Sequence, residues 1–149
     1  MKEDKDYFIK CILPNISNSP LVLTGESAFV YNGLSVSGYY KPAVLTNKEF
    51  LKGVNLEGLV RYCYISEPID TTHYVKPLEE VPKILVPTIE RAIVENIKYN
   101  LEFIDEGSFY DSLEMYDLNM ELLTEVANHF NVSMDKIKSH LKEAYLLWI

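Results

Sequence analysis

The chain has 149 residues, of which 48% are hydrophobic and 24% charged, and its formal net charge is −8. This composition is typical of a folded globular protein whose single core needs no disulfide or metal ion to form. Because phosphate contacts dominate nucleic-acid affinity, a net negative charge disfavours non-specific binding to DNA or RNA. The acidic excess lies mainly in residues 76–149, where 14 acidic side chains face 7 basic ones, so a basic protein partner suits the charge better.

Cysteine usage and hydrophobicity indicate the cellular compartment. Cys11 and Cys63 lie in apolar segments without CxxC spacing, which predicts two buried free thiols in a reducing compartment. No segment approaches the roughly 18 consecutive apolar residues of a membrane-spanning helix, and the acidic start of the chain is unlike a signal peptide. We therefore expect a cytoplasmic protein with no membrane segment.

The first quarter of the chain predicts two short helices. The apolar residues between Tyr7 and Leu13 indicate a helix that ends at Pro14. A brief apolar lead at Leu21–Leu23 precedes Thr24-Gly25-Glu26-Ser27, which is suitable chemistry for the start of a second helix that Asn32-Gly33 ends. One glycine without a following lysine does not make a phosphate-binding loop, so no nucleotide site is predicted there.

The next segments predict strands. Ala43–Leu45 is a short apolar strand, and Thr46 with Glu49 has the spacing of a capping box for a helical turn over Asn47–Lys52. Leu59–Ile65 is rich in β-forming residues and is the clearest strand. Residues 66–82 contain three prolines and are predicted to be a loop, with an extended piece at His73–Val75.

Residues 84–100 form the stretch around which the rest is organised. Ile84–Val86 is an apolar run bounded by prolines, which predicts a buried strand. Thr88 then offers a helix N-cap, followed by apolar residues at helical spacing. Glu90 and Arg91 lie at the start of this helix, where we expect a partly buried polar clamp to the sheet of Ala43–Leu45, Leu59–Ile65 and Ile84–Val86.

After Asn100 the hydrophobic pattern is helical throughout. It includes Phe103, Ile104, Phe109, Leu113, Met115 and several later residues, and Ser133 is the predicted N-cap of a last helix over Met134–Trp148. The sequence thus predicts an α/β (α+β) fold, with a small mixed sheet of about three to four short strands packed with helices and a C-terminal helical bundle. The predicted domains are an α/β core over 1–100 and a helical subdomain over 101–149 that packs on it.

No set of residues at motif spacing predicts a catalytic, cofactor or metal site. His73 has no second ligand at metal spacing, so we interpret it as a loop-packing residue. His129 and His140 lie on different predicted helices, without a Ser, Cys or carboxylate partner at motif spacing. The acidic residues lack the D-x-D spacing that presents paired carboxylates to a metal. We therefore expect a protein that is not an enzyme.

Residues 122–142 also permit a helix-turn-helix interpretation. A turn at Phe130–Val132 separates two predicted helices, and the second would present Lys136, Lys138, Ser139 and Lys142 to a major groove. Against this, residues 121–143 hold four acidic side chains and three lysines. A pair of core helices joined by a tight turn has the same pattern, so both interpretations remain open.

Three blocks of sequence together resemble one family. LTGESAFVYNGLS, with Ser27 and Ala28, is similar to the helix that opens the core of abortive-infection E type antitoxins (AbiEi-like, of type IV toxin–antitoxin systems). KPAVLTNKE resembles the strand that follows, and ILVPTIERAIVENI resembles the family's ERxxxD helix, with Glu90, Arg91 and Glu95, where the family usually has Asp. The resemblance covers about residues 21–147.

This resemblance implies an antitoxin that counteracts a nucleotidyltransferase-like toxin in phage defence. Family members typically carry an N-terminal winged helix that binds their promoter, and we expect none in the 20 residues before the first core strand. Promoter binding is therefore not predicted. A DNA-binding transcriptional regulator that uses residues 122–142 is the alternative. A degenerate nucleotidyltransferase-like protein ranks third, because PAVLT stands where the toxins have a paired-Asp strand.

Overall fold

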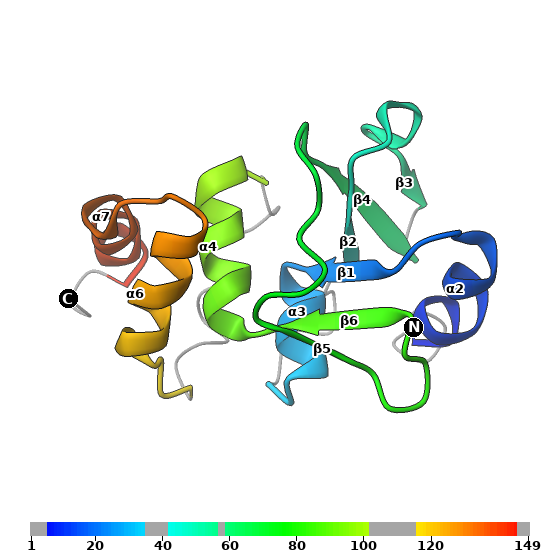
Figure 1. Ribbon diagram of the computed structural model, residues 1–149, viewed down its shortest axis with the longest axis horizontal. Helices are drawn as coiled ribbons and strands as arrows, with labels where there is room; N and C mark the ends of the chain where they lie inside the picture. The colour runs from blue at the N-terminus through cyan, green and yellow to red at the C-terminus, as the bar shows by residue number, and fades with distance from the viewer. Residues whose placement is uncertain (1–5, 35–41, 57–58, 102–115, 146–149) are drawn as a thin grey trace.

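A six-stranded mixed sheet forms one half of the protein in the computed structural model, which describes residues 6–34, 42–56, 59–101 and 116–145 (Figure 1). Its strand order is β3-β4-β2-β1-β6-β5. The strands are β1 (Leu21–Thr24), β2 (Ala43–Thr46), β3 (Asn55–Leu56), β4 (Val60–Tyr64), β5 (Val75–Pro77) and β6 (Ile84–Pro87). The predicted α/β class is confirmed.

The predicted number of three to four strands was too low. Leu21–Leu23 was predicted as an apolar lead into a helix, yet it belongs to β1, one of the two central strands, which is antiparallel to β2 and parallel to β6. The edge strand β3 was not predicted, and β5 overlaps the predicted extended piece His73–Val75 only at Val75. The two strands have two and three residues and are largely exposed. Segments this short carry no apolar alternation, so only pairing with β4 and β6 identifies them as strands.

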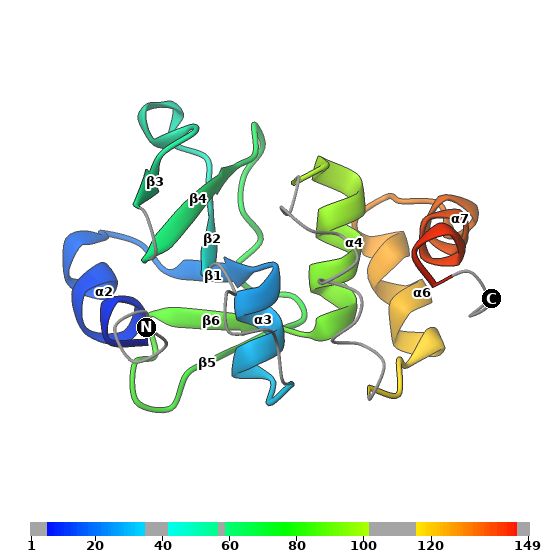
Figure 2. The ribbon, with the colours of Figure 1, turned by 180° about the vertical axis from the view of Figure 1, so that it is seen from behind.

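Some helices pack on the sheet, and others lie beyond one end of it. The N-terminal segment forms a π-helical turn, η1 (Phe8–Ile12), and α2 (Leu13–Ile16), and a 3₁₀ turn, η2 (Glu49–Leu51), follows β2. The other helices are α3 (Glu26–Tyr31), α4 (Ile89–Tyr99), α6 (Met120–His129) and α7 (Met134–Tyr145). Figures 1 and 2 both show α4 between the sheet and the C-terminal pair α6 and α7.

The longer helices begin at the residues that their sequences favour. The Thr88 hydroxyl accepts a hydrogen bond from the Arg91 backbone N–H at 3.1 Å, which confirms Thr88 as the N-cap of α4. Ser133 caps α7 in the same way through the N–H of Lys136, at 3.2 Å. Asn100 ends α4 with a left-handed backbone (φ 50°), a conformation that asparagine tolerates better than most residues. Local side-chain chemistry thus fixes both ends of α4.

Strand burial follows from the apolar runs. Every residue of β1, β2 and β6 is buried, which is the pattern of strands covered on both faces. One cluster of buried side chains joins α3 and α4 to α6 and α7 through residues such as Phe29, Ile93, Leu123 and Ile137. The two C-terminal helices therefore complete a core that begins in the sheet half of the chain.

Some predictions for the C-terminal third fall outside the described residues. These include the helical pattern from Phe103 to Met115 and the end of the last helix at Trp148. A C-terminal bundle is not confirmed, since the described part consists of α6 and α7 packed beside α4. The domain boundary at residue 100 stays a prediction.

The two cysteines differ in environment. Cys63 is buried on β4, as predicted, but Cys11 is exposed and the prediction for it was wrong. The π-helical turn directs Phe8 and Ile9 into the core and leaves Cys11 on its outer side. Among the described residues, no helix has the length and apolar character needed to cross a membrane.

Candidate functional site: a buried polar junction at α4

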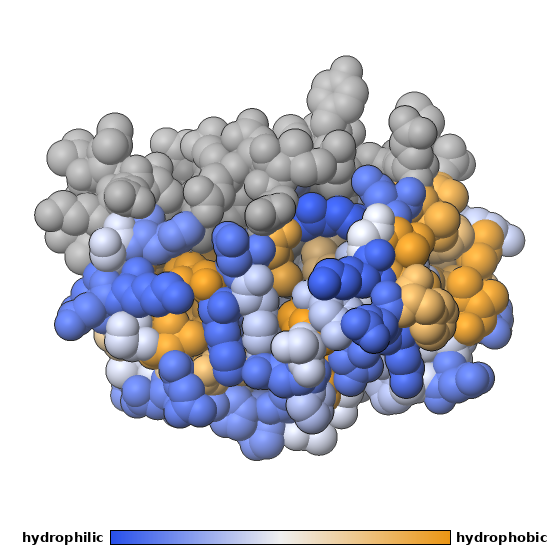
Figure 3. Space-filling model, turned by 90° about the horizontal axis from the view of Figure 1, so that it is seen from above, coloured by the Kyte–Doolittle hydropathy of each residue, from blue (hydrophilic) through white to orange (hydrophobic). Residues whose placement is uncertain are grey.

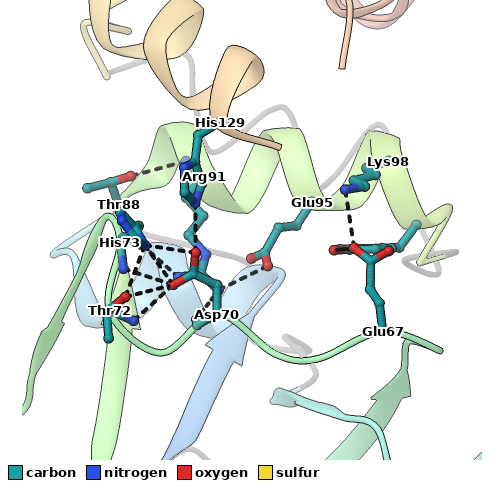
Figure 4. Close-up of polar contacts among 10 residues, drawn as sticks. Glu67, Asp70, Thr72, His73, Thr88, Arg91, Glu95, Lys98 and His129 are labelled. Carbon is teal, nitrogen blue, oxygen red and sulfur yellow. Dashed lines mark hydrogen bonds and ion pairs between the residues drawn. The ribbon is translucent and has the colours of Figure 1, made fainter. Parts of the chain in front are cut away.

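The start of α4 carries a set of buried polar side chains, Glu90, Arg91 and Glu95, that we call the polar junction. Arg91 is completely buried and donates from Nη1 to the His73 carbonyl and from Nη2 to the Asp70 carbonyl, both at 2.7 Å. Its Nη2 also donates to Glu95 Oε2 at 3.1 Å (Figure 4). The guanidinium therefore ties the loop between β4 and β5 to α4.

Glu95 supplies the charge that accompanies Arg91. Burial raises the pKa of the Glu95 carboxyl, and the adjacent Arg91 cation opposes that rise. The guanidinium carbon also lies 5.2 Å from the centre of the Phe130 ring, at the end of α6. The buried cation thus has a carboxylate, two carbonyls and an aromatic face as partners, while Arg91 Nε and Glu95 Oε1 are buried without a hydrogen bond to another described residue.

Glu90 points to a different part of the chain. It is 1% exposed, and its Oε2 accepts hydrogen bonds from the Tyr116 hydroxyl at 2.7 Å and from the Asn119 backbone N–H at 3.0 Å. Burial and the hydrogen bond to Glu90 raise the pKa of the Tyr116 hydroxyl. Glu90 thus holds the segment that leads into α6.

The predicted clamp at Glu90 and Arg91 needs a correction. The two side chains are fully rather than partly buried, and the described hydrogen bonds of their side chains go to the loop before β5, to α4 itself and to the segment before α6. The predicted partner, the sheet, is wrong. The backbone groups of the central strands are paired within the sheet, whereas the loop before β5 and the segment before α6 offer the carbonyl and N–H groups that Arg91 and Glu90 bind.

The other residues of the family-type motif lie on α3. Ser27 is fully buried, and its hydroxyl accepts a hydrogen bond from the Ala43 backbone N–H at 2.8 Å, which joins α3 to β2. Ala28 is also fully buried and belongs to the cluster that contains Ile89 and Ile93 of α4. The first of the three family-type blocks therefore packs against both of the others.

A second polar cluster lies on the solvent side of Arg91 and consists of Asp70, His73 and His129. His129 Nε2 lies 2.7 Å from Asp70 Oδ2, and His73 Nδ1 lies 3.0 Å from the same oxygen. The two imidazole rings are 4.2 Å apart between centres. Figure 4 shows His129 reaching down from α6 while Asp70 and His73 come from the loop.

Hydrogen bonding keeps Asp70 ionised. Partial burial by itself raises the pKa of this carboxyl, but hydrogen bonds from His129, from the backbone of Thr72 and His73, and from the His73 ring outweigh it. The pKa of Asp70 is therefore held well below its ordinary value.

This cluster was not predicted from the sequence. His73 was expected to be a loop-packing residue without a second ligand, and His129 had no carboxylate partner at motif spacing. Asp70 and His129 are 59 residues apart, so no spacing rule connects them. The only local hint of this cluster is the Asp70-x-x-His73 spacing within the loop. This spacing suggests a three-residue site only when the position of His129 on α6 is known.

The helix-turn-helix residues lie on the outermost helix. α6 and α7 are joined by a tight turn in which Asn131 has a left-handed backbone (φ 59°). Lys136, Lys138 and Ser139 are exposed on α7, and Lys142 falls in its last part, where only the backbone is described. Lys98 of α4 and Lys136 of α7 line a shallow groove between the two helices.

Comparisons with known proteins give no relative. No family model matches the chain, and neither the curated proteins nor the solved structures contain a match.

Proposed function

We propose that this protein is a non-enzymatic, antitoxin-like interaction module that counteracts a nucleotidyltransferase-like toxin. The observation that carries the proposal is the packing of the three family-type blocks into one unit. Ser27 of the first block bonds to Ala43 of the second, and Ala28 lies in one cluster with α4 of the third. This packing supports the proposal because the resemblance requires the three blocks to form one core.

The molecular surface offers a place for a protein partner. Large hydrophobic side chains are exposed on η1, α2, η2 and β3, with Phe50 at 79% and Ile16 at 66%. Figure 3 shows hydrophobic side chains gathered at the end of the molecule that carries these elements. Leu13, Ile16, Phe50 and Tyr62 line a groove there. Exposed apolar patches of this kind mark protein contacts, and the chain's charge of −8 favours a basic partner.

Co-expression with a neighbouring nucleotidyltransferase-like toxin gene tests the proposal. We expect the chain to relieve the growth arrest that the toxin causes. Phe50→Asp places a charge on the exposed patch without touching the core, so this variant should fold and lose the relief. Lys76→Asp, on the largely exposed edge strand β5 at the other side of the sheet, is the matched control and should keep it. Unrelieved arrest in the presence of folded protein would remove the antitoxin proposal.

A DNA-binding regulator is the second candidate, favoured by the exposed Lys136, Lys138 and Ser139 on the outermost helix. A mobility-shift titration against the gene's own upstream region, repeated over a salt series, separates the two. Binding that weakens steeply with salt, and weakens further in Lys136→Ala and Lys138→Ala, would favour the regulator. Phe50→Asp should leave DNA binding unchanged.

A further inference from the structure

The Asp70, His73 and His129 cluster has the composition of a transition-metal site. Its three ligand atoms, one carboxylate oxygen and two imidazole nitrogens, all lie within 4.8 Å of one another. Oxygen-only sites suit Ca²⁺ and Mg²⁺, whereas two imidazoles with one carboxylate suit Zn²⁺ and related ions. The ligands come from a loop and from α6, which are distant in sequence.

The two separations from Asp70 Oδ2 are close to those around a bound ion, and the separation between the two imidazole nitrogens is under 4.8 Å. Ligand atoms bound at about 2.0 to 2.2 Å to one tetrahedral Zn²⁺ lie about 3.3 Å apart. The observed separations from Asp70 Oδ2 are 2.7 Å to His129 Nε2 and 3.0 Å to His73 Nδ1. Each must widen by a few tenths of an ångström, which side-chain rotation supplies because the His73 and His129 side chains are 55% and 29% exposed.

The two carboxylate oxygens of Asp70 have different roles: one accepts hydrogen bonds from the loop backbone, and the other is directed toward the imidazoles. Asp70 Oδ1 accepts the backbone N–H groups of Thr72 and His73, both at 2.9 Å. Oδ2 faces the two imidazoles, and His73 Nδ1 also lies 3.2 Å from Oδ1 and 3.0 Å from the Thr72 hydroxyl. Beneath the loop, Arg91 holds the carbonyls of Asp70 and His73 at 2.7 Å, so both ligands stand on a fixed backbone. Supported ligands of this kind lose little freedom on binding a metal.

The nearby cation does not repel a metal strongly. Arg91 is paired with Glu95 at 3.1 Å, and that ion pair is buried beneath the loop. Because the charge of Arg91 is balanced by Glu95, the Asp70 carboxylate keeps its negative charge available for a metal ion. Imidazole binds a metal through the lone pair of an unprotonated ring nitrogen. On binding, the nitrogen that faces Asp70 in each ring would therefore bind the metal, and the proton would lie on the other nitrogen.

From this geometry we propose that Asp70, His73 and His129 bind one Zn²⁺ ion, which fastens the loop between β4 and β5 to the end of α6. Three protein ligands leave a fourth position for water. This inference does not depend on the antitoxin proposal. A metal at this position would stabilise the contact between the sheet half and the C-terminal helices, since Zn²⁺ then binds only the folded arrangement.

The test uses the full chain, treated with a chelator and titrated with Zn²⁺ alone by calorimetry, and with Co²⁺ as a spectroscopic substitute. We expect one ion per chain, a rise in melting temperature on adding Zn²⁺, and Co²⁺ absorption bands of a four-coordinate site. His129→Ala and Asp70→Asn should each weaken binding by at least about tenfold. His140→Ala is the matched control. It changes the chain's remaining histidine, which lies on α7, and should bind Zn²⁺ like the parent.

Melting curves without metal show whether each variant is folded, and His129→Gln replaces His129→Ala if the latter is not. Binding that is absent in the parent, or equally strong in the folded His129 and Asp70 variants, would overturn the proposal. Loss of binding in His140→Ala would place the ion elsewhere and would also overturn it. Toxin relief in the co-expression assay is measured separately, so failure of one proposal leaves the other standing.

Discussion

The central strands and the start of α4 bury side chains of opposite character. In β1, β2 and β6 the buried residues are apolar apart from threonines at strand ends, and their backbone groups are paired within the sheet. At the polar junction, Glu90, Arg91 and Glu95 are as deeply buried as the strands. Apolar burial depends on area and tolerates small changes, whereas a buried charge depends on each of its partners.

This difference explains how the two halves of the molecule are held together. The sheet could accept several packings of similar hydrophobic residues. Arg91 binds two specific carbonyls, and Glu90 binds one hydroxyl and one N–H group. Consecutive residues thus fix two different segments, one before β5 and one before α6.

The largest expected effect comes from breaking the junction. Arg91→Ala removes three hydrogen bonds and leaves Glu95 buried without its cation, so we expect a loss of about 2 to 4 kcal/mol in the free energy of unfolding. Chemical denaturation measures it. A variant that melts like the parent but no longer relieves toxin arrest would instead assign Arg91 to a functional surface.

A conservative change at the polar junction should lower the free energy of unfolding by a smaller amount. Glu90→Gln keeps an acceptor for Tyr116 and Asn119 but removes the charge that strengthens both hydrogen bonds, and we expect a loss of about 1.5 kcal/mol. The same denaturation experiment applies. An increase in stability would mean that desolvation of the carboxylate outweighs its hydrogen bonds.

The matching change on the apolar side of α4 is Ile93→Val, which deletes one methylene from a fully buried side chain. We expect a loss of about 1 kcal/mol, with the junction intact. Residues 90 and 93 are i,i+3 neighbours on α4, so we expect the combined variant to deviate from additivity by about 0.5 kcal/mol or more. Strict additivity would show that the packing at Ile93 is independent of the hydrogen bonds at Glu90.

The junction should also introduce an alkaline pH dependence. The pKa of Tyr116 is raised in the folded protein, by burial and by its hydrogen bond to Glu90. Its contribution is therefore fully present below the unfolded pKa of about 10 and is lost as the pH rises above that value. Melting temperatures measured from neutral to alkaline pH should fall less steeply in Tyr116→Phe. Equal slopes would contradict the assignment.

The smallest effect is a difference in thiol reactivity. Burial raises the pKa of Cys63, whereas Cys11 is exposed on η1. A thiol reagent added to the native chain should modify Cys11 quickly and Cys63 slowly, and denaturant should remove the difference. Mass spectrometry of peptides distinguishes the sites. Rapid modification of Cys63 in the native state would show that β4 opens readily.

The sequence alone determined the elements with local signals. The apolar run at Ile84–Val86, the hydroxyl of Thr88 and the spacing of the residues that follow predicted β6 and α4 with nearly their observed bounds. Ser133 likewise predicted the start of α7. Strand hydrophobicity and helix capping act over a few residues, so these elements can be read from neighbouring positions.

Only the tertiary structure decided what those elements bring together. The edge strands β3 and β5 exist because neighbours supply their hydrogen bonds, and no residue pattern within them requires a strand. Arg91 was predicted to be a clamp, but its partners are loop carbonyls whose positions depend on the path of the chain. His129 meets Asp70 because α6 packs beside the loop that follows β4, and contacts between segments so far apart in sequence leave no local periodic signal.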